Sequence, residues 1–161
     1  MKSRVLTAVF FLMISTAIVS APALAQSSSS ALITKANLKQ SLENLGYETV
    51  DLGSDTYQIK LVQGASVPIS VALSSDGSRI WLITNLGKKV LSNLSSERLI
   101  KMLQSNRNIG TSFFALTTDR LEMLSVLENR SITPVLLRKA IELQASNVSN
   151  TVALWDDEGA N

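Results

Sequence analysis

The chain has 161 residues, with 15 lysines and arginines, 13 aspartates and glutamates, no histidine and no cysteine. The absence of cysteine excludes disulfides, thiol catalysis and thiolate metal sites, and the absence of histidine excludes imidazole bases and imidazole metal ligands. The nearly balanced charge, without a basic run, argues against nucleic acid as a partner.

The chain begins with the three parts of a secretory signal peptide. Lys2 and Arg4 give a positive start, and the apolar run after them is about 15 residues long, shorter than the roughly 20 of a membrane-spanning helix. Small residues follow and include Ala23 and Ala25, so we expect cleavage between Ala25 and Gln26. The mature chain then has 13 basic and 13 acidic side chains, and no membrane contact is expected after cleavage.

A polar, serine-rich leader at 26–30 is predicted to be a flexible tether before the folded domain. The first helix is predicted over 34–45, with Thr34 as its N-cap and leucines at every third or fourth position on one side. Gly46 follows the last of these leucines, where a helix favours a glycine in a left-handed conformation.

The hydrophobic period then changes from 3.6 to 2, which predicts strands. The predicted strands cover 47–52, 57–61, 67–73 and 79–84. The stretch Ser75-Asp76-Gly77-Ser78 is typical of a hairpin turn between the last two. Together these segments predict an antiparallel meander of three or four strands.

A second helix is predicted to begin at the N-cap Ser95 and to end at Asn106. The segment 112–117 is predicted to be a strand. The spacing of leucines in 120–128 fits either a strand or a helix, and the turn between the two segments favours a strand that closes a hairpin.

The last helix is predicted to have Thr133 as its N-cap and Pro134 in its first position, and to continue past Val148. The element order is therefore α-β-β-β-α-β-β-α, which predicts an α+β domain over 31–152 with helices packed on an antiparallel sheet of about five strands. An acidic tail at 153–161 follows.

Catalysis would have to depend on carboxylates or lysines. Asp51 and Asp55 flank a turn, where aspartate commonly bonds to its own backbone, while Asp156, Asp157 and Glu158 belong to the acidic tail. The mature chain contains no Ser-x-x-Lys and no G-x-G-x-x-G. We therefore assign no catalytic residue, no cofactor and no metal ligand, and expect the protein not to be an enzyme.

Three Asn-x-Ser triplets begin at Asn93, Asn129 and Asn147, and would be glycosylation acceptors in a eukaryote. The Ala-x-Ala junction and the absence of cysteine are more typical of a bacterial envelope protein, in which such triplets occur by chance. We therefore expect a periplasmic or secreted protein.

Other residues have two interpretations. Trp81 lies in a continuous apolar strand, so both faces of that strand are expected to be covered, by helices of the same domain or by a second protein; the core interpretation is favoured. Trp155 is either a packing anchor or part of a contact surface. Lys88 and Lys89 are interpreted as a solvated loop rather than an anion site.

Four segments carry a resemblance to a known family: 45–47 closing the first helix, 79–84 after Ser-Asp-Gly, 113–116, and 129–134 leading into the last helix. With them the chain resembles the YbjN-like family, which is related in fold to type III secretion chaperones. The resemblance implies a non-enzymatic binding fold, often dimeric, that presents a sheet or helix surface to a partner protein.

The leading hypothesis is thus an exported protein-interaction domain whose partner is another protein or a second copy. The alternative is a small-ligand-binding periplasmic module with a pocket between sheet and helices. A hydrolase that depends on carboxylates alone is the third hypothesis.

Overall fold

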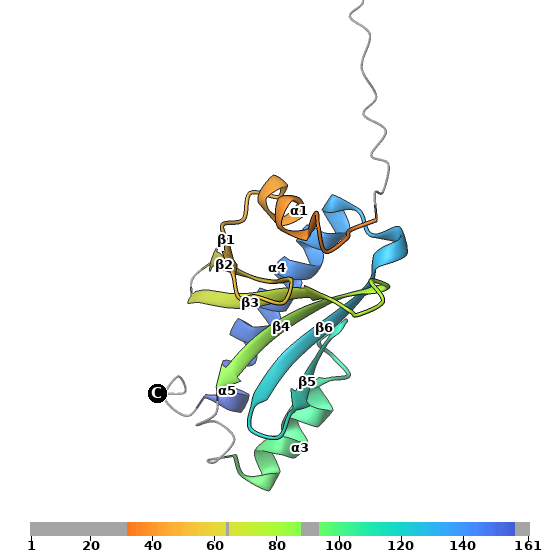
Figure 1. The fold of residues 1–161 in the computed structure, drawn as a ribbon. Coiled ribbons are helices and arrows are strands. Elements are labelled where there is room, and N and C mark those ends of the chain that lie inside the picture. Colours follow the sequence, from red (N-terminus) through yellow and green to blue (C-terminus); the bar gives the residue numbers. More distant parts are fainter. Residues whose placement is uncertain (1–31, 64, 88–93, 157–161) are drawn as a thin grey trace, which may run out of the picture.

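The computed structural model describes residues 32–63, 65–87 and 94–156. These residues form a six-stranded antiparallel sheet with the strand order β1-β2-β3-β4-β6-β5, and α4 passes behind it in Figure 1. The predicted α+β class is confirmed, with six strands where about five were expected. The predicted signal peptide, the leader and the residues after 156 lie outside the described residues.

The first half of the domain contains one helix and four strands. They are α1 (Leu38–Asn44), β1 (Thr49–Asp51), β2 (Thr56–Gln63), β3 (Ala65–Leu73) and β4 (Arg79–Gly87). The predicted meander is therefore confirmed with four strands. Gly46 has a φ of +87°, as the predicted left-handed cap requires.

The predicted start of the first helix at Thr34 is wrong. Regular helix begins at Leu38, and Asn37 occupies the N-cap position. The reason is local: Asn37 Oδ1 accepts a hydrogen bond from the Thr34 N–H (2.7 Å), which holds the residues before the helix in a separate turn.

The second half contains α3 (Ser96–Ser105), β5 (Ser112–Leu116), β6 (Leu121–Glu128), a 3₁₀ turn (Asn129–Ser131), α4 (Pro134–Asn150) and α5 (Val152–Trp155). The N-caps Ser95 and Thr133 accept hydrogen bonds from the N–H groups three residues later, as predicted. The ambiguous segment 120–128 is a strand. The 3₁₀ turn and α5 were not predicted.

The core lies between the sheet and α1 and α4. Alternate residues of each strand point to this inner face, and α4 contacts β3, β4 and β6. The fully buried side chains there include Leu38, Leu42, Ile59, Ile69, Ile80, Leu82, Leu121, Met123, Leu137 and Ile141. In the described residues this inner face is covered mainly by α1 and α4.

A buried polar cluster lies within this core. Gln144 of α4 accepts hydrogen bonds at Oε1 from Ser112 (3.0 Å) and Ser125 (2.6 Å), which lie opposite each other on β5 and β6. Its Nε2 donates to the Met123 carbonyl (2.7 Å) and to Thr84 Oγ1 (3.3 Å). One amide thus joins α4 to three strands, and its polar atoms are satisfied.

Candidate functional site

The outer face of the sheet, opposite α1 and α4, carries an apolar patch. The strand register places Ala72, Trp81 and Val126 in one row across β3, β4 and β6. The next row contains Ile83, Leu124 and Phe113 on β4, β6 and β5. We call these six residues the outer patch. No helix of the described residues crosses it in Figure 1, which views the sheet from this side.

The outer patch arises because β4 and β6 are apolar on both faces. Ile80 and Leu82 point to the core and are buried, while Trp81 and Ile83 between them point outward and are half-buried. The interpretation of Trp81 as a core residue is therefore wrong, and the interpretation as an interface residue remains. A sheet whose two faces are both apolar normally has both faces covered.

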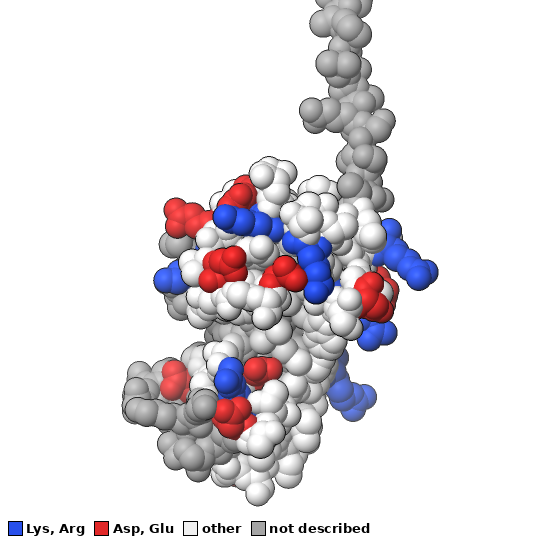
Figure 2. All heavy atoms as spheres, in the orientation of Figure 1, with Lys and Arg blue, Asp and Glu red and all other residues white. Residues whose placement is uncertain are grey.

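Charged residues frame the outer patch at both ends. At one end Arg79 Nε lies 3.6 Å from Glu128 Oε1, across neighbouring strands. At the other end Glu122 stands between Asn85 and Ala115 in the register. In the space-filling view the middle of this face is largely uncharged, with most charged side chains in the upper part and a smaller group lower down (Figure 2).

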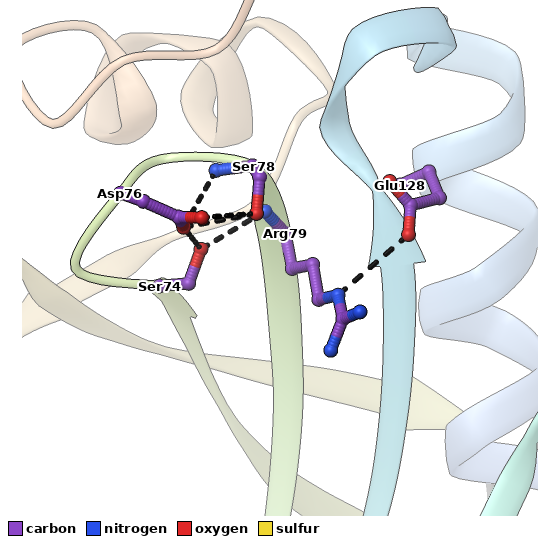
Figure 3. A network of polar contacts seen from close by, with 5 residues as sticks. All are labelled: Ser74, Asp76, Ser78, Arg79 and Glu128. Atoms are coloured by element: carbon purple, nitrogen blue, oxygen red, sulfur yellow. Dashed lines mark hydrogen bonds and ion pairs between the residues drawn. The ribbon is translucent and has the colours of Figure 1, made fainter.

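The β3–β4 turn beside the Arg79 end is held by Asp76 (Figure 3). Asp76 Oδ1 accepts hydrogen bonds from Ser74 Oγ (2.5 Å), the Ser78 N–H (3.0 Å) and Ser78 Oγ (2.9 Å). These bonds favour the ionised carboxylate and lower its pKa to about 2, from a usual 3.8. The turn is thus fixed by its own side chains, which places Arg79 at the start of β4.

A concave feature lies between the segment 45–50, β2 and α4. It is a groove of about 680 Å³, which we call the fork groove. Its lining residues are Leu45, Gly46, Tyr47, Glu48, Val50, Gln58, Lys60, Leu61, Arg138 and Glu142. Charges of both signs and a phenol therefore share one groove.

Burial raises the pKa of the Tyr47 hydroxyl in the fork groove, Glu142 raises it further, and Arg138 opposes both effects. Tyr47 therefore stays protonated at neutral pH. Arg138 Nη2 donates a hydrogen bond to the Leu45 carbonyl (2.9 Å), which ties α4 to the end of α1. The groove can offer a phenol, two carboxylates and two cations to a ligand.

The residues considered for chemistry have structural roles where they are described. Asp51 Oδ1 accepts a hydrogen bond from the Gly53 N–H (2.7 Å), and Asp55 pairs with Lys35 (3.2 Å). Among the described residues no three histidine, cysteine, aspartate or glutamate side chains form a group that could hold a metal ion. Ala23, Ala25, Gln26, the paired lysines, Asp157 and Glu158 lie outside the described residues.

Two of the Asn-x-Ser triplets are structural. Asn129 and Asn147 are buried, and both amides donate to backbone carbonyls. Neither side chain can carry a sugar in this fold. Asn93 lies outside the described residues.

Trp155 packs against the core cluster from α5 and is half-buried, in agreement with the packing-anchor interpretation. Its indole N–H is buried and has no hydrogen-bond acceptor among the residues that the structure describes. Sequence reasoning could not find this feature, because it depends on where the short α5 lies.

No protein-family model matches the chain, and no curated protein matches it. Solved structures do. YbjN from E. coli matches with a TM-score of 0.53 and 12% identity, over 76% of this chain and 94% of that one. No helix in the described residues has the length and apolar character to cross a membrane.

Complexes of secretion chaperones match as well. A chain of the HopA1–SchA chaperone–effector complex has a TM-score of 0.51 and 12% identity, over 72% of this chain and 90% of that one. A chain of the ExoU–SpcU complex from the type III secretion system of Pseudomonas aeruginosa has a TM-score of 0.54 and 16% identity, over 74% and 98%. At such identities the likeness shows the fold alone, and for the fold the resemblance is confirmed.

Proposed function

We propose that this chain is an exported, non-enzymatic protein-binding module, and that a second copy of the chain docks on its outer patch. The observation that carries the proposal is the outer patch, two rows of apolar side chains on a sheet face that no described helix covers. Burial of such a face is the main favourable term in protein association. The fold shared with chains of chaperone–effector complexes supports a binding role.

Export to the periplasm or beyond is part of the proposal and is supported by the sequence. The charged start, the apolar run and the Ala23-x-Ala25 junction together have the form of a cleaved signal peptide. A mature chain starting at Gln26 would carry the domain behind a short polar tether.

The charges around the outer patch suit a symmetric partner. Two sheet faces that pack about a two-fold axis perpendicular to the strands bring the Arg79 end of one copy against the Glu122 end of the other. Because Arg79 is paired with Glu128, each end brings a polar rim against the other copy, around the apolar centre.

The size of the outer patch fits the centre of an interface. Its four strands, at a spacing of about 4.8 Å, make it roughly 14 Å wide. A standard interface buries about 800 Å² on each partner, so the outer patch would form the apolar centre and the charged residues its rim.

The test is the molar mass of the mature chain, 26–161, by light scattering over a dilution series. We expect a dimer that dissociates on dilution, and a Trp81→Lys variant whose dissociation constant is at least about tenfold higher, because a lysine would be buried in the apolar centre. Val135→Lys, which adds the same charge on the outward side of α4, should dimerise like the unchanged chain. A monomer at every concentration would contradict the proposal.

The fork groove favours a second candidate function, binding of a small ligand. Its volume lies within the usual range for ligand sites, and Tyr47, Lys60 and Glu142 provide polar groups of different kinds. A thermal-shift screen of the mature chain tests this, since a ligand that binds only the folded state raises the melting temperature. Loss of such a shift in Tyr47→Phe would locate the ligand in the groove.

A further inference from the structure

Helix α5 is short and lies near the end of the described residues. It has four residues, none of them fully buried, and among the elements it contacts mainly α3 and α4. One long side chain reaches it from α3: Arg98 Nη2 donates a hydrogen bond to the Ala153 carbonyl (3.3 Å). Leu154 and Trp155 supply its apolar contacts with the core.

The end of α4 does not depend on α5. Thr151 leaves the helical conformation, with φ −107° and ψ 10°, and closes α4 with its own groups. Its N–H and its Oγ1 both donate to the Asn147 carbonyl, at 3.1 and 2.7 Å. The Asn147 carbonyl, near the end of α4, therefore keeps both of its Thr151 donors when α5 moves away.

The docked position of α5 is itself imperfect. Within the described ranges 32–63, 65–87 and 94–156, the buried indole N–H of Trp155 has no acceptor, and a buried donor without a partner opposes the state that buries it. In the released state this N–H would bond to water. The Trp155 side chain, which anchors α5, therefore also adds an unfavourable free energy to the docked state, and this favours release of α5.

The side of α3 that faces α5 holds the only fully buried side chain of that helix. Met102 is 1% exposed and follows Arg98, the residue that bonds to α5, by one helical turn. Ile100 and Leu103, on the other side of α3, are 54% and 65% exposed. Release of α5 would therefore add the Met102 side chain to the apolar side chains that α3 exposes, Ile100 and Leu103.

We propose that α5 is a releasable cover over the Met102 side of α3, and that it controls access to that side. The docked state closes an apolar surface with a segment of the same chain. The released state opens this surface without unfolding α4 or the sheet. This inference is independent of the outer patch, which lies on the other face of the sheet.

The two methionines of the mature chain allow a direct test. Met102 lies on the side of α3 that carries Arg98, which bonds to α5, and Met123 is buried on β6 with 0% exposure. Dilute hydrogen peroxide transfers one oxygen to an accessible thioether sulfur and leaves water, and mass spectrometry of peptides follows each sulfoxide. We expect Met102 to oxidise at least tenfold faster than Met123, because only Met102 is exposed by release of α5.

Trp155→Ala should raise the oxidation rate of Met102 at least fivefold and leave that of Met123 unchanged, because it removes the anchor of α5 alone. Val135→Ala, on the exposed side of α4, is the matched control and should change neither rate. Equal rates for the two methionines in the unchanged chain, or a rise in both in Trp155→Ala, would overturn the proposal, since either result means that Met102 is exposed by global unfolding.

Hydrogen exchange gives a second measurement that needs no variant. The N–H of Leu154 bonds to the Thr151 carbonyl (2.8 Å) in α5, and the N–H of Leu137 bonds to the Thr133 carbonyl (2.9 Å) in α4. The proposal expects at least a hundredfold less protection for Leu154 than for Leu137. Equal protection would show that α5 opens only with the whole domain and would overturn the proposal.

Discussion

At the scale of single residues, two asparagine side chains each bond to both the N–H and the carbonyl of one distant residue, as a neighbouring strand would. Asn106 accepts a hydrogen bond from the Phe114 N–H (2.7 Å) and donates to its carbonyl (3.4 Å), on the free edge of β5. Asn129 does the same for Ile33, with 3.2 Å to the N–H and 2.6 Å to the carbonyl. An amide can do this because it carries a donor and an acceptor side by side, as a peptide group does.

Asn129→Ala should destabilise the domain by about 3 kcal/mol. It leaves the N–H and carbonyl of Ile33 and the carbonyl of Gly77 without their buried partners, each at a cost of about 1–3 kcal/mol that water entry partly relieves. Urea unfolding of the mature chain measures the change. Asn108→Ala, at an exposed position, should leave the midpoint within error; a similar midpoint for both variants would refute the role of Asn129.

Asp76 predicts a dependence on pH. Because its pKa is lowered to about 2 in the folded state, its contribution to stability is present above the usual value of 3.8 and is lost as the pH falls through 2. The melting temperature of the unchanged chain should therefore exceed that of Asp76→Asn at pH 6, and the difference should shrink between pH 4 and pH 2. A difference that stays constant over this range would show that the charge of Asp76 is irrelevant.

At the scale of elements, most of the fold could be predicted from sequence. Alternation identified β2 and β3, and the capping residues Ser95 and Thr133 located the starts of α3 and α4. These signals are local, so they survive without tertiary information. The predicted start of α1 is too early because Thr34 and Asn37 both suit an N-cap. The turn that joins them, held by the hydrogen bond from the Thr34 N–H to Asn37 Oδ1, determines that the helix begins after Asn37.

The order of the strands across the sheet, by contrast, could not be predicted from the sequence. β6 lies between β4 and β5. The second strand of the final hairpin therefore pairs with the rest of the sheet, and the first strand forms its edge. Nothing in the hydrophobic pattern of residues 112–128 distinguishes this order from its reverse. The polar residues that match the observed order, Ser112, Ser125 and Gln144, are scattered in sequence and become a cluster only in the fold.

Gln144→Leu should destabilise the domain by about 2–4 kcal/mol, although leucine is the more hydrophobic residue. The change leaves the Met123 carbonyl without its Gln144 donor and the two serines without their acceptor, at a position with 0% exposure. Thermal and urea unfolding measure the loss. Gln104→Leu, exposed on α3, is the control, and equal effects for the two would mean that the buried cluster has no particular role.

At the scale of the whole molecule, the candidate site could be predicted only in part. The apolar run around Trp81 indicated that both faces of its strand needed cover, and the structure shows which face lacks it. The extent of the outer patch depends on which residues of β3, β5 and β6 stand beside Trp81, and this register is set by long-range pairing. The fork groove and the cover α5 join segments about 90 and 50 residues apart, beyond the reach of local patterns.

The burial of Asn129 has a consequence for how the protein can be made. In a eukaryotic secretory pathway a sugar is transferred to Asn-x-Ser before the chain has folded, when the asparagine side chain is still accessible. A glycan on Asn129 would block the bonds that this amide makes to Ile33 and Gly77, and the chain could not close around it. A route that attached a glycan to Asn129 would therefore prevent this fold from forming.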